Sequence, residues 1–156
     1  MKITSRLLTV ALFSFAASAA AKAEQTFSIH QDPPNLTEVD FGAPGRLHGN
    51  ILAYHANFTT KEGGKGVMHG MVTAVHVSDH KSLERVASIV LDFGGVDTIV
   101  IGGKAVYGGP TVEMETDRPQ VRAIVGGTGR FIGARGQITT VRKPAGHYVH
   151  DIRLLD

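Results

Sequence analysis

After Pro33-Pro34, the hydrophobic positions gather in short stretches that are rich in Val, Ile, Thr and Phe and are divided by pairs of glycines. Almost no segment repeats its apolar residues with the 3.6-residue period of an amphipathic helix. Short β-branched stretches between turn residues are typical of strands, so the pattern predicts an all-β protein. Strands are predicted over residues 36–41, 47–60, 66–77, 86–93, 98–101, 111–115, 121–125, 137–142 and 147–154.

Glycine pairs separate these stretches and predict tight turns, because glycine adopts a positive φ without steric cost. Strands joined by such turns are antiparallel. Residues 78–85 contain no glycine and begin with a serine that can cap a helix, but the segment is short, and we predict a polar loop there. Eight or nine antiparallel strands form either a sandwich or a barrel, and the pattern leaves both open. The pairs are Gly63-Gly64, Gly94-Gly95, Gly102-Gly103, Gly108-Gly109 and Gly126-Gly127.

The first 23 residues have the pattern of a secretory signal peptide. Lys2 and Arg6 precede an apolar stretch over residues 7–20, and Ala21-Lys22-Ala23 matches a small-x-small cleavage site. The apolar stretch is shorter than the roughly 20 residues that a membrane-spanning helix needs. We therefore predict cleavage after Ala23 and a secreted or periplasmic mature chain without a membrane span. Residues 24–35, with two adjacent prolines, are predicted to be an extended arm, and residues 36–156 one β domain.

Composition and charge exclude several classes of function. The chain has no Cys, which excludes thiolate metal sites, iron–sulfur clusters and cysteine nucleophiles. The predicted leader contains 3 of the 16 basic residues, so 13 remain against 14 acidic residues, and the mature chain is not basic. Binding to a nucleic-acid backbone needs a clustered basic excess, so no nucleic-acid partner is expected.

A glycine-rich block at residues 125–133, VGGTGRFIG, superficially matches a dinucleotide-binding loop. Such a loop needs a long helix directly after the glycines, whose amides face the pyrophosphate. Here a β-branched run, Ile138-Thr139-Thr140-Val141, follows instead. We interpret the block as strand, hairpin and strand, in which the glycines serve turn geometry and close strand approach.

Interpreted in this way, residues 122–136, RAIVGGTGRFIGARG, closely resemble the signature of the dirigent protein and allene oxide cyclase superfamily. The resemblance extends upstream to LDFGG at 91–95, TIVIGG at 98–103 and the stretch 66–77, and more weakly to the last strand at 148–154. It implies an eight-stranded antiparallel β-barrel with an elongated apolar cavity, usually assembled as a homotrimer, without a metal or organic cofactor. Members of this superfamily cyclise a reactive fatty-acid epoxide or hold phenoxy radicals for stereoselective coupling, and the latter needs a partner oxidase.

The resemblance favours an exported barrel that binds a small hydrophobic molecule and steers its cyclisation or stereoselective coupling, as a cofactor-independent cyclase or isomerase would. The alternative is a non-catalytic carrier or stress-related barrel that only binds the molecule. A third interpretation is a structural or adhesive trimer with a filled interior. An open cavity of roughly several hundred cubic ångströms with at least two convergent polar groups would favour the first two, and a barrel plugged by side chains would eliminate both.

Four residues are candidates for catalysis. Asp92 ends a predicted strand as a cavity acid, or else it caps the following glycine turn. Dirigent proteins often carry an arginine six residues before the first glycine of the motif, where this chain has Gln120, but Arg122 shares that face. Arg122 is otherwise a surface or interface cation. Glu38 and Asp40 share one strand face in a region faintly similar to the first strand of allene oxide cyclases, and either a buried acid or a solvated edge explains the pair.

Four more residues are candidates for ligand binding. His55 and His69 are expected almost opposite each other if the hairpin between them turns near Glu62-Gly63. Two imidazoles without a third ligand make a poor metal site, so no metal is predicted, and the pair is a candidate for orienting a substrate. Tyr107 and Tyr148 are further cavity candidates, with packing at the barrel rim as their alternative role.

Overall fold

The computed structural model describes residues 24–41, 48–78, 82–108 and 113–155, and the predicted signal peptide lies outside these ranges. The described residues form nine strands in one antiparallel sheet, with two 3-10 turns, η1 (Gly129–Phe131) and η2 (Pro144–Gly146). No helix in these ranges is long and apolar enough to cross a membrane. The strands are β1 (Gln25–Gln31), β2 (Asn35–Val39), β3 (Ile51–Thr60), β4 (Lys65–Ser78), β5 (Ser82–Asp92), β6 (Thr98–Gly108), β7 (Gln120–Thr128), β8 (Arg135–Arg142) and β9 (Tyr148–Leu155).

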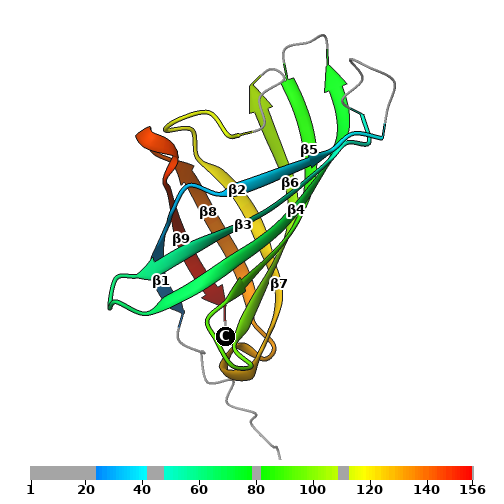
Figure 1. Cartoon of the computed structure of the whole chain (residues 1–156). Coiled ribbons are helices and arrows are strands. Elements are labelled where there is room, and N and C mark those ends of the chain that lie inside the picture. Colours follow the sequence, from blue (N-terminus) through cyan, green and yellow to red (C-terminus); the bar gives the residue numbers. More distant parts are fainter. Residues whose placement is uncertain (1–23, 42–47, 79–81, 109–112, 156) are drawn as a thin grey trace, which may run out of the picture.

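The sheet closes into an eight-stranded barrel because β1 pairs with β9 on one side and with the end of β3 on the other (Figure 1). Strand β2 pairs with the beginning of β3, in nearly the same register as β1. The two short strands are therefore halves of one barrel strand, interrupted at Pro33-Pro34. Proline has no amide hydrogen to donate to a ladder, which explains the break. The predicted barrel fold is confirmed.

Three details differ from the sequence-based expectation. The predicted arm at 24–35 is extended, but its residues Gln25–Gln31 pair with β9 and form part of the barrel wall. The predicted strand at 111–115 is not found over Glu113–Glu115, while Thr111 and Val112 lie outside the described residues. Segment 78–85 is not a polar loop throughout, because β5 begins at Ser82.

Two of the predicted glycine turns are also wrong. Gly102-Gly103 lies inside β6 and Gly126-Gly127 inside β7, where the ladder between these strands is shifted by a bulge. A Cβ on Gly127 would lie 2.5 Å from the carbonyl oxygen of Phe131 and 2.6 Å from that of Thr98. Glycine is present there because backbone passes close by, not because the chain reverses direction. Gly94 and Gly95, by contrast, both have positive φ in the β5–β6 turn, as predicted.

The barrel interior is packed in two clusters. The larger contains inward-facing aliphatic residues of most strands and is capped by aromatic rings, in which Phe93 lies 5.0 Å from Phe131 and 5.1 Å from Phe58, between ring centroids. The smaller cluster lies around Tyr107, Met114 and Tyr148. Residues of both clusters line one cavity, so the barrel is filled at the aromatic end and hollow between the clusters.

Candidate functional site

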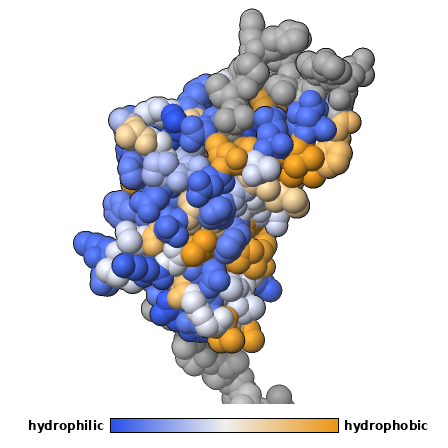
Figure 2. All heavy atoms as spheres, in the orientation of Figure 1, coloured by the Kyte–Doolittle hydropathy of each residue, from blue (hydrophilic) through white to orange (hydrophobic). Residues whose placement is uncertain are grey.

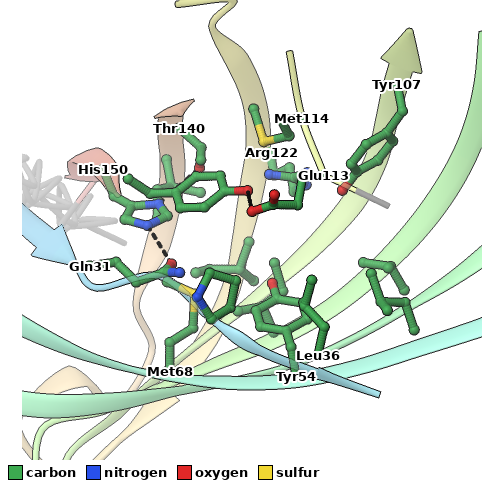
Figure 3. A pocket seen from close by; sticks show the side chains of 17 residues that line it. Gln31, Leu36, Tyr54, Met68, Tyr107, Glu113, Met114, Arg122, Thr140 and His150 are labelled. Carbon is green, nitrogen blue, oxygen red and sulfur yellow. Dashed lines mark hydrogen bonds between the residues drawn. The ribbon is translucent and has the colours of Figure 1, made fainter. Parts of the chain in front are cut away.

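A cavity occupies the hollow part of the barrel interior, and all nine strands contribute to its wall (Figure 3). The open volume of the cavity is about 50 Å³. The whole space between the lining atoms, including solvent at the mouth, is about 550 Å³. This is room for a few waters or for a narrow ligand. The cavity is lined by Gln31, Pro34, Leu36, Leu52, Tyr54, Met68, Val72, Ile89, Ile101, Tyr107, Glu113, Met114, Arg122, Ile138, Thr140, Tyr148 and His150.

Arg122 is the buried cation of this wall. It lies on β7 between the outward-facing, exposed Val121 and Ala123, so strand alternation turns its side chain inward. Only 5% of it is exposed, and its Nε atom has no hydrogen-bond partner. No ion pair between described residues includes Arg122. Burying a cation without a partner costs several kcal/mol of folding free energy, so Arg122 lowers the stability of the barrel.

Tyr54 lies on the wall of the same cavity, on β3. Its ring fits there because the residue opposite it on β4 is Gly70, where any side chain would collide with the ring. Burial raises the pKa of Tyr54 above its ordinary value, although the positive charge of Arg122 partly offsets this effect. Its hydroxyl therefore stays protonated and can donate a hydrogen bond.

His150 is completely buried on β9 and forms the centre of a hydrogen-bonded relay. Its Nδ1 atom lies 3.0 Å from Thr140 Oγ1, and its Nε2 atom lies 2.9 Å from Gln31 Oε1. The Gln31 amide nitrogen donates to the carbonyl oxygen of Asp32 at 3.2 Å, so the Gln31 oxygen is free to accept from His150. Burial, and then the charges of Arg122 and His30, lowers the pKa of His150 to about 3. The ring is therefore neutral, with the proton on Nε2.

Glu113 holds the rim of the cavity. One of its carboxylate oxygens accepts from the Tyr148 hydroxyl at 3.2 Å, and the other pairs with Arg142 at 2.8 Å. Burial, and then the Glu113 carboxylate, raises the pKa of Tyr148. The contacts tie the segment after β6 to β8 and β9 across the mouth.

The structure brings three of the eight predicted site residues to the cavity: Arg122, Tyr107 and Tyr148. Asp92 is on the outer face of β5, where its Oδ1 accepts from the amide of Gly94 at 2.8 Å. It is therefore the turn cap that was the alternative interpretation. Glu38 and Asp40 are exposed and do not line the cavity, and Glu38 lies 3.4 Å from the Asn50 side-chain amide.

His55 and His69 are paired in the β3–β4 register, as the sequence predicts. Both are exposed on the outer face, beside a shallow groove, so they do not meet a molecule inside the barrel. No group of three or more metal-ligating side chains occurs in the described ranges.

Sequence reasoning missed Tyr54, His150, Gln31, Thr140 and Glu113. For His150 a signal existed, because it alternates with Tyr148, Ile152 and Leu154, all buried on β9. Glu113 follows no strand alternation, since it lies outside the strands, and only the fold brings it to the rim.

No family model and no curated protein matches the sequence. Solved structures do share the fold. A pyocyanin demethylase superposes with a TM-score of 0.62 at 17% identity, covering 85% of this chain and 99% of its own. A pterocarpan synthase dirigent protein gives a TM-score of 0.51 at 18% identity, covering 92% and 94%. The chain has a dirigent-like barrel fold.

Another solved structure with a similar fold is a nonspecific heme-binding cyclase that catalyses a [4 + 2] cycloaddition during neoabyssomicin biosynthesis. It gives a TM-score of 0.60 at 15% identity over 86% of this chain, which spans 65% of the cyclase. At these identities the likeness establishes the fold. The barrel fold that the resemblance implied is confirmed.

Proposed function

We propose that this dirigent-like barrel binds a small hydrophobic molecule in its interior and steers the cyclisation or stereoselective coupling of that molecule. The observation that carries the proposal is the cavity itself, in which an apolar wall surrounds buried Arg122 and partly buried Tyr54. Barrels of the same fold named as a cyclase, a demethylase and a dirigent protein support it. A ligand-binding site of this kind is mostly apolar, with few polar groups that fix orientation.

The chemistry that such a cavity can supply is conformational. A molecule already prone to react is held in one folded shape, and water is kept away from it. The narrow interior suits this role, since little free space is left for other conformations.

Filling the mouth of the cavity is expected to abolish ligand binding without unfolding the barrel. Leu36 lines the cavity and is 38% exposed, so Leu36→Trp fits at the rim and blocks it. Val39 on the same strand is 40% exposed and lies on the opposite face, which makes Val39→Trp the matched control. With 2-naphthamide as a neutral probe, isothermal titration calorimetry should show affinity weakened at least about tenfold in Leu36→Trp only. Equal affinities in both variants and the wild type would count against an interior site.

A non-catalytic carrier is the second candidate, and His150 favours it. This imidazole is the one histidine of the cavity wall among the described residues, and both its nitrogens are engaged in the relay. The decisive experiment is mass spectrometry of small molecules extracted from the purified protein, followed by incubation of the released compound class with fresh protein. Conversion identifies a catalyst, and retention without conversion identifies a carrier.

Export and assembly complete the proposal. We propose that the mature chain is secreted or periplasmic, forms a homotrimer and, if its reaction is radical coupling, works with a partner oxidase. Exposed apolar residues on the outer faces of β4, β5 and β7 support an assembly, and apolar spheres gather on one side of the barrel in Figure 2. They include Met71, Val75, Val86, Val121 and Val125.

The trimer is tested by light scattering after size-exclusion chromatography of residues 24–156. The wild type should have three times the monomer mass, and Val86→Glu should shift it to the monomer because a charge would be buried in the interface. Ile132→Glu, at an 83% exposed position beside η1, is the control and should remain trimeric. A monomeric wild type would refute the trimer.

A further inference from the structure

We propose that the molecule bound in the barrel carries an anionic oxygen, as a carboxylate or phenolate does, on a flat apolar body, and that the Arg122 guanidinium holds this oxygen. The inference rests on the proposed function, because it presupposes that a ligand occupies the interior. It adds the chemical class of that ligand.

The hydrogen-bond acceptors of the cavity wall have partners more often than its donors do. Both Glu113 carboxylate oxygens accept hydrogen bonds, from Tyr148 and Arg142, and the Gln31 amide oxygen accepts from His150. The donors are less completely used. Arg122 Nε has no partner, and within the described ranges the hydroxyls of Tyr54 and Tyr107 have no hydrogen bond. A wall with spare donors and engaged acceptors is complementary to a ligand that brings an acceptor.

The charge inventory points to an anion rather than a neutral carbonyl. Arg122 brings a guanidinium group, which offers N–H donors and no acceptor. Neither Tyr54 nor Tyr148 opposes it with a negative charge, since burial favours the neutral phenol in both. The Glu113 carboxylate at the rim is matched by Arg142 at 2.8 Å. Among the described residues that line the cavity, Arg122 is therefore the cation without a carboxylate partner, and an anionic ligand would satisfy it.

The remaining wall defines the body of the ligand. Met68, Ile101 and Ile138 are almost completely buried and present only apolar surface to the cavity. In Figure 3, Tyr54 lies on the lower side of the cavity and Arg122 on the upper side, between Met114 and Glu113 in the view. The small open volume between them suits a planar ring system better than a bulky one.

The test compares two probes of the same shape, 2-naphthoate and 2-naphthamide, in the mature protein at pH 7. The wild type is expected to bind the carboxylate about thirtyfold more tightly than the amide, because a hydrogen bond between two charged groups is stronger than one to a neutral acceptor. In Arg122→Met and Arg122→Gln the two affinities should come within about threefold of each other, chiefly through loss of carboxylate binding. Arg135→Gln removes an exposed positive charge from β8 and should keep the wild-type preference.

The outcomes separate this inference from the function on which it rests. Equal binding of both probes by the wild type, or a carboxylate preference that survives both Arg122 variants, would overturn the oxyanion site and leave the ligand-binding barrel in place. Binding of neither probe by a folded wild type would overturn both. Because the preference is a ratio measured within one variant, modest changes in stability do not affect it, and thermal melting identifies any variant that is unfolded.

Discussion

Replacing Gly127 by alanine is expected to lower the free energy of unfolding by about 3 kcal/mol, whereas the same change at the neighbouring Gly126 should alter it by less than about 0.5 kcal/mol. A Cβ at position 127 would lie within 2.6 Å of two backbone carbonyl oxygens, those of Phe131 and Thr98. Backbone in two paired strands and the following turn cannot move aside as a flexible side chain can. At position 126 no heavy atom lies within 4 Å of the added carbon.

Urea unfolding followed by far-ultraviolet circular dichroism measures the difference, and the two variants are each other's control. A large loss of unfolding free energy in Gly127→Ala, with none in Gly126→Ala, would show that the glycine block allows the strands to approach closely. Equal losses would contradict this explanation. A nucleotide-cradling loop would instead require both variants to fold normally and to lose nucleotide binding.

The second large effect is acid sensitivity caused by His150. Because burial lowers its pKa to about 3 in the folded protein, the unfolded chain binds a proton at this residue at a higher pH than the folded chain does. Its contribution to stability is therefore present above about pH 6.5 and is lost as the pH falls towards 3. In this window His150 should lower the free energy of unfolding by up to about 1.4 kcal/mol per pH unit.

Urea unfolding at a series of pH values between 7 and 3 tests this expectation. His150→Gln loses the relay and should be less stable at pH 7, but the gap to the wild type should narrow or reverse on acidification. His69→Gln, at an exposed position, should follow the wild-type curve. Parallel curves for the wild type and His150→Gln would mean that the imidazole is not held neutral.

Much of the fold was predictable because strand alternation and glycine turns are local signals. Strands from β3 onward begin and end near the predicted positions, apart from the glycines inside β6 and β7 and the segment around Glu113. Strand β1 was hidden because its sequence, QTFSIHQ, is largely polar and its partner β9 lies more than a hundred residues away. The pairing of β1 with β9 forms only when the barrel closes, so a short stretch of sequence contains no signal for it.

The candidate site was predictable in part for a related reason. Alternation shows which residues share a face, but it does not show which face is inside. Asp92 does end a strand, as predicted, yet on β5 Leu91 faces the core and Asp92 faces outwards. The same holds for His55 and His69, whose register was predicted correctly but whose side chains are exposed. Arg122 was found because it shares a strand face with Gln120, the position at which dirigent proteins often carry an arginine.

The interruption at Pro33-Pro34 affects how the barrel can widen. Pairing between β1 and β9 ends at Gln31 and Tyr148. Beyond that point β2 pairs with β3 alone, so the other edge of β2 forms no ladder of backbone hydrogen bonds. Pro34 and Leu36 lie at this unpaired edge and line the cavity. Parting the wall at this point would separate side chains without breaking a ladder hydrogen bond. The mouth of the cavity at Pro34 and Leu36 therefore lies against a stretch of wall that backbone pairing does not hold closed.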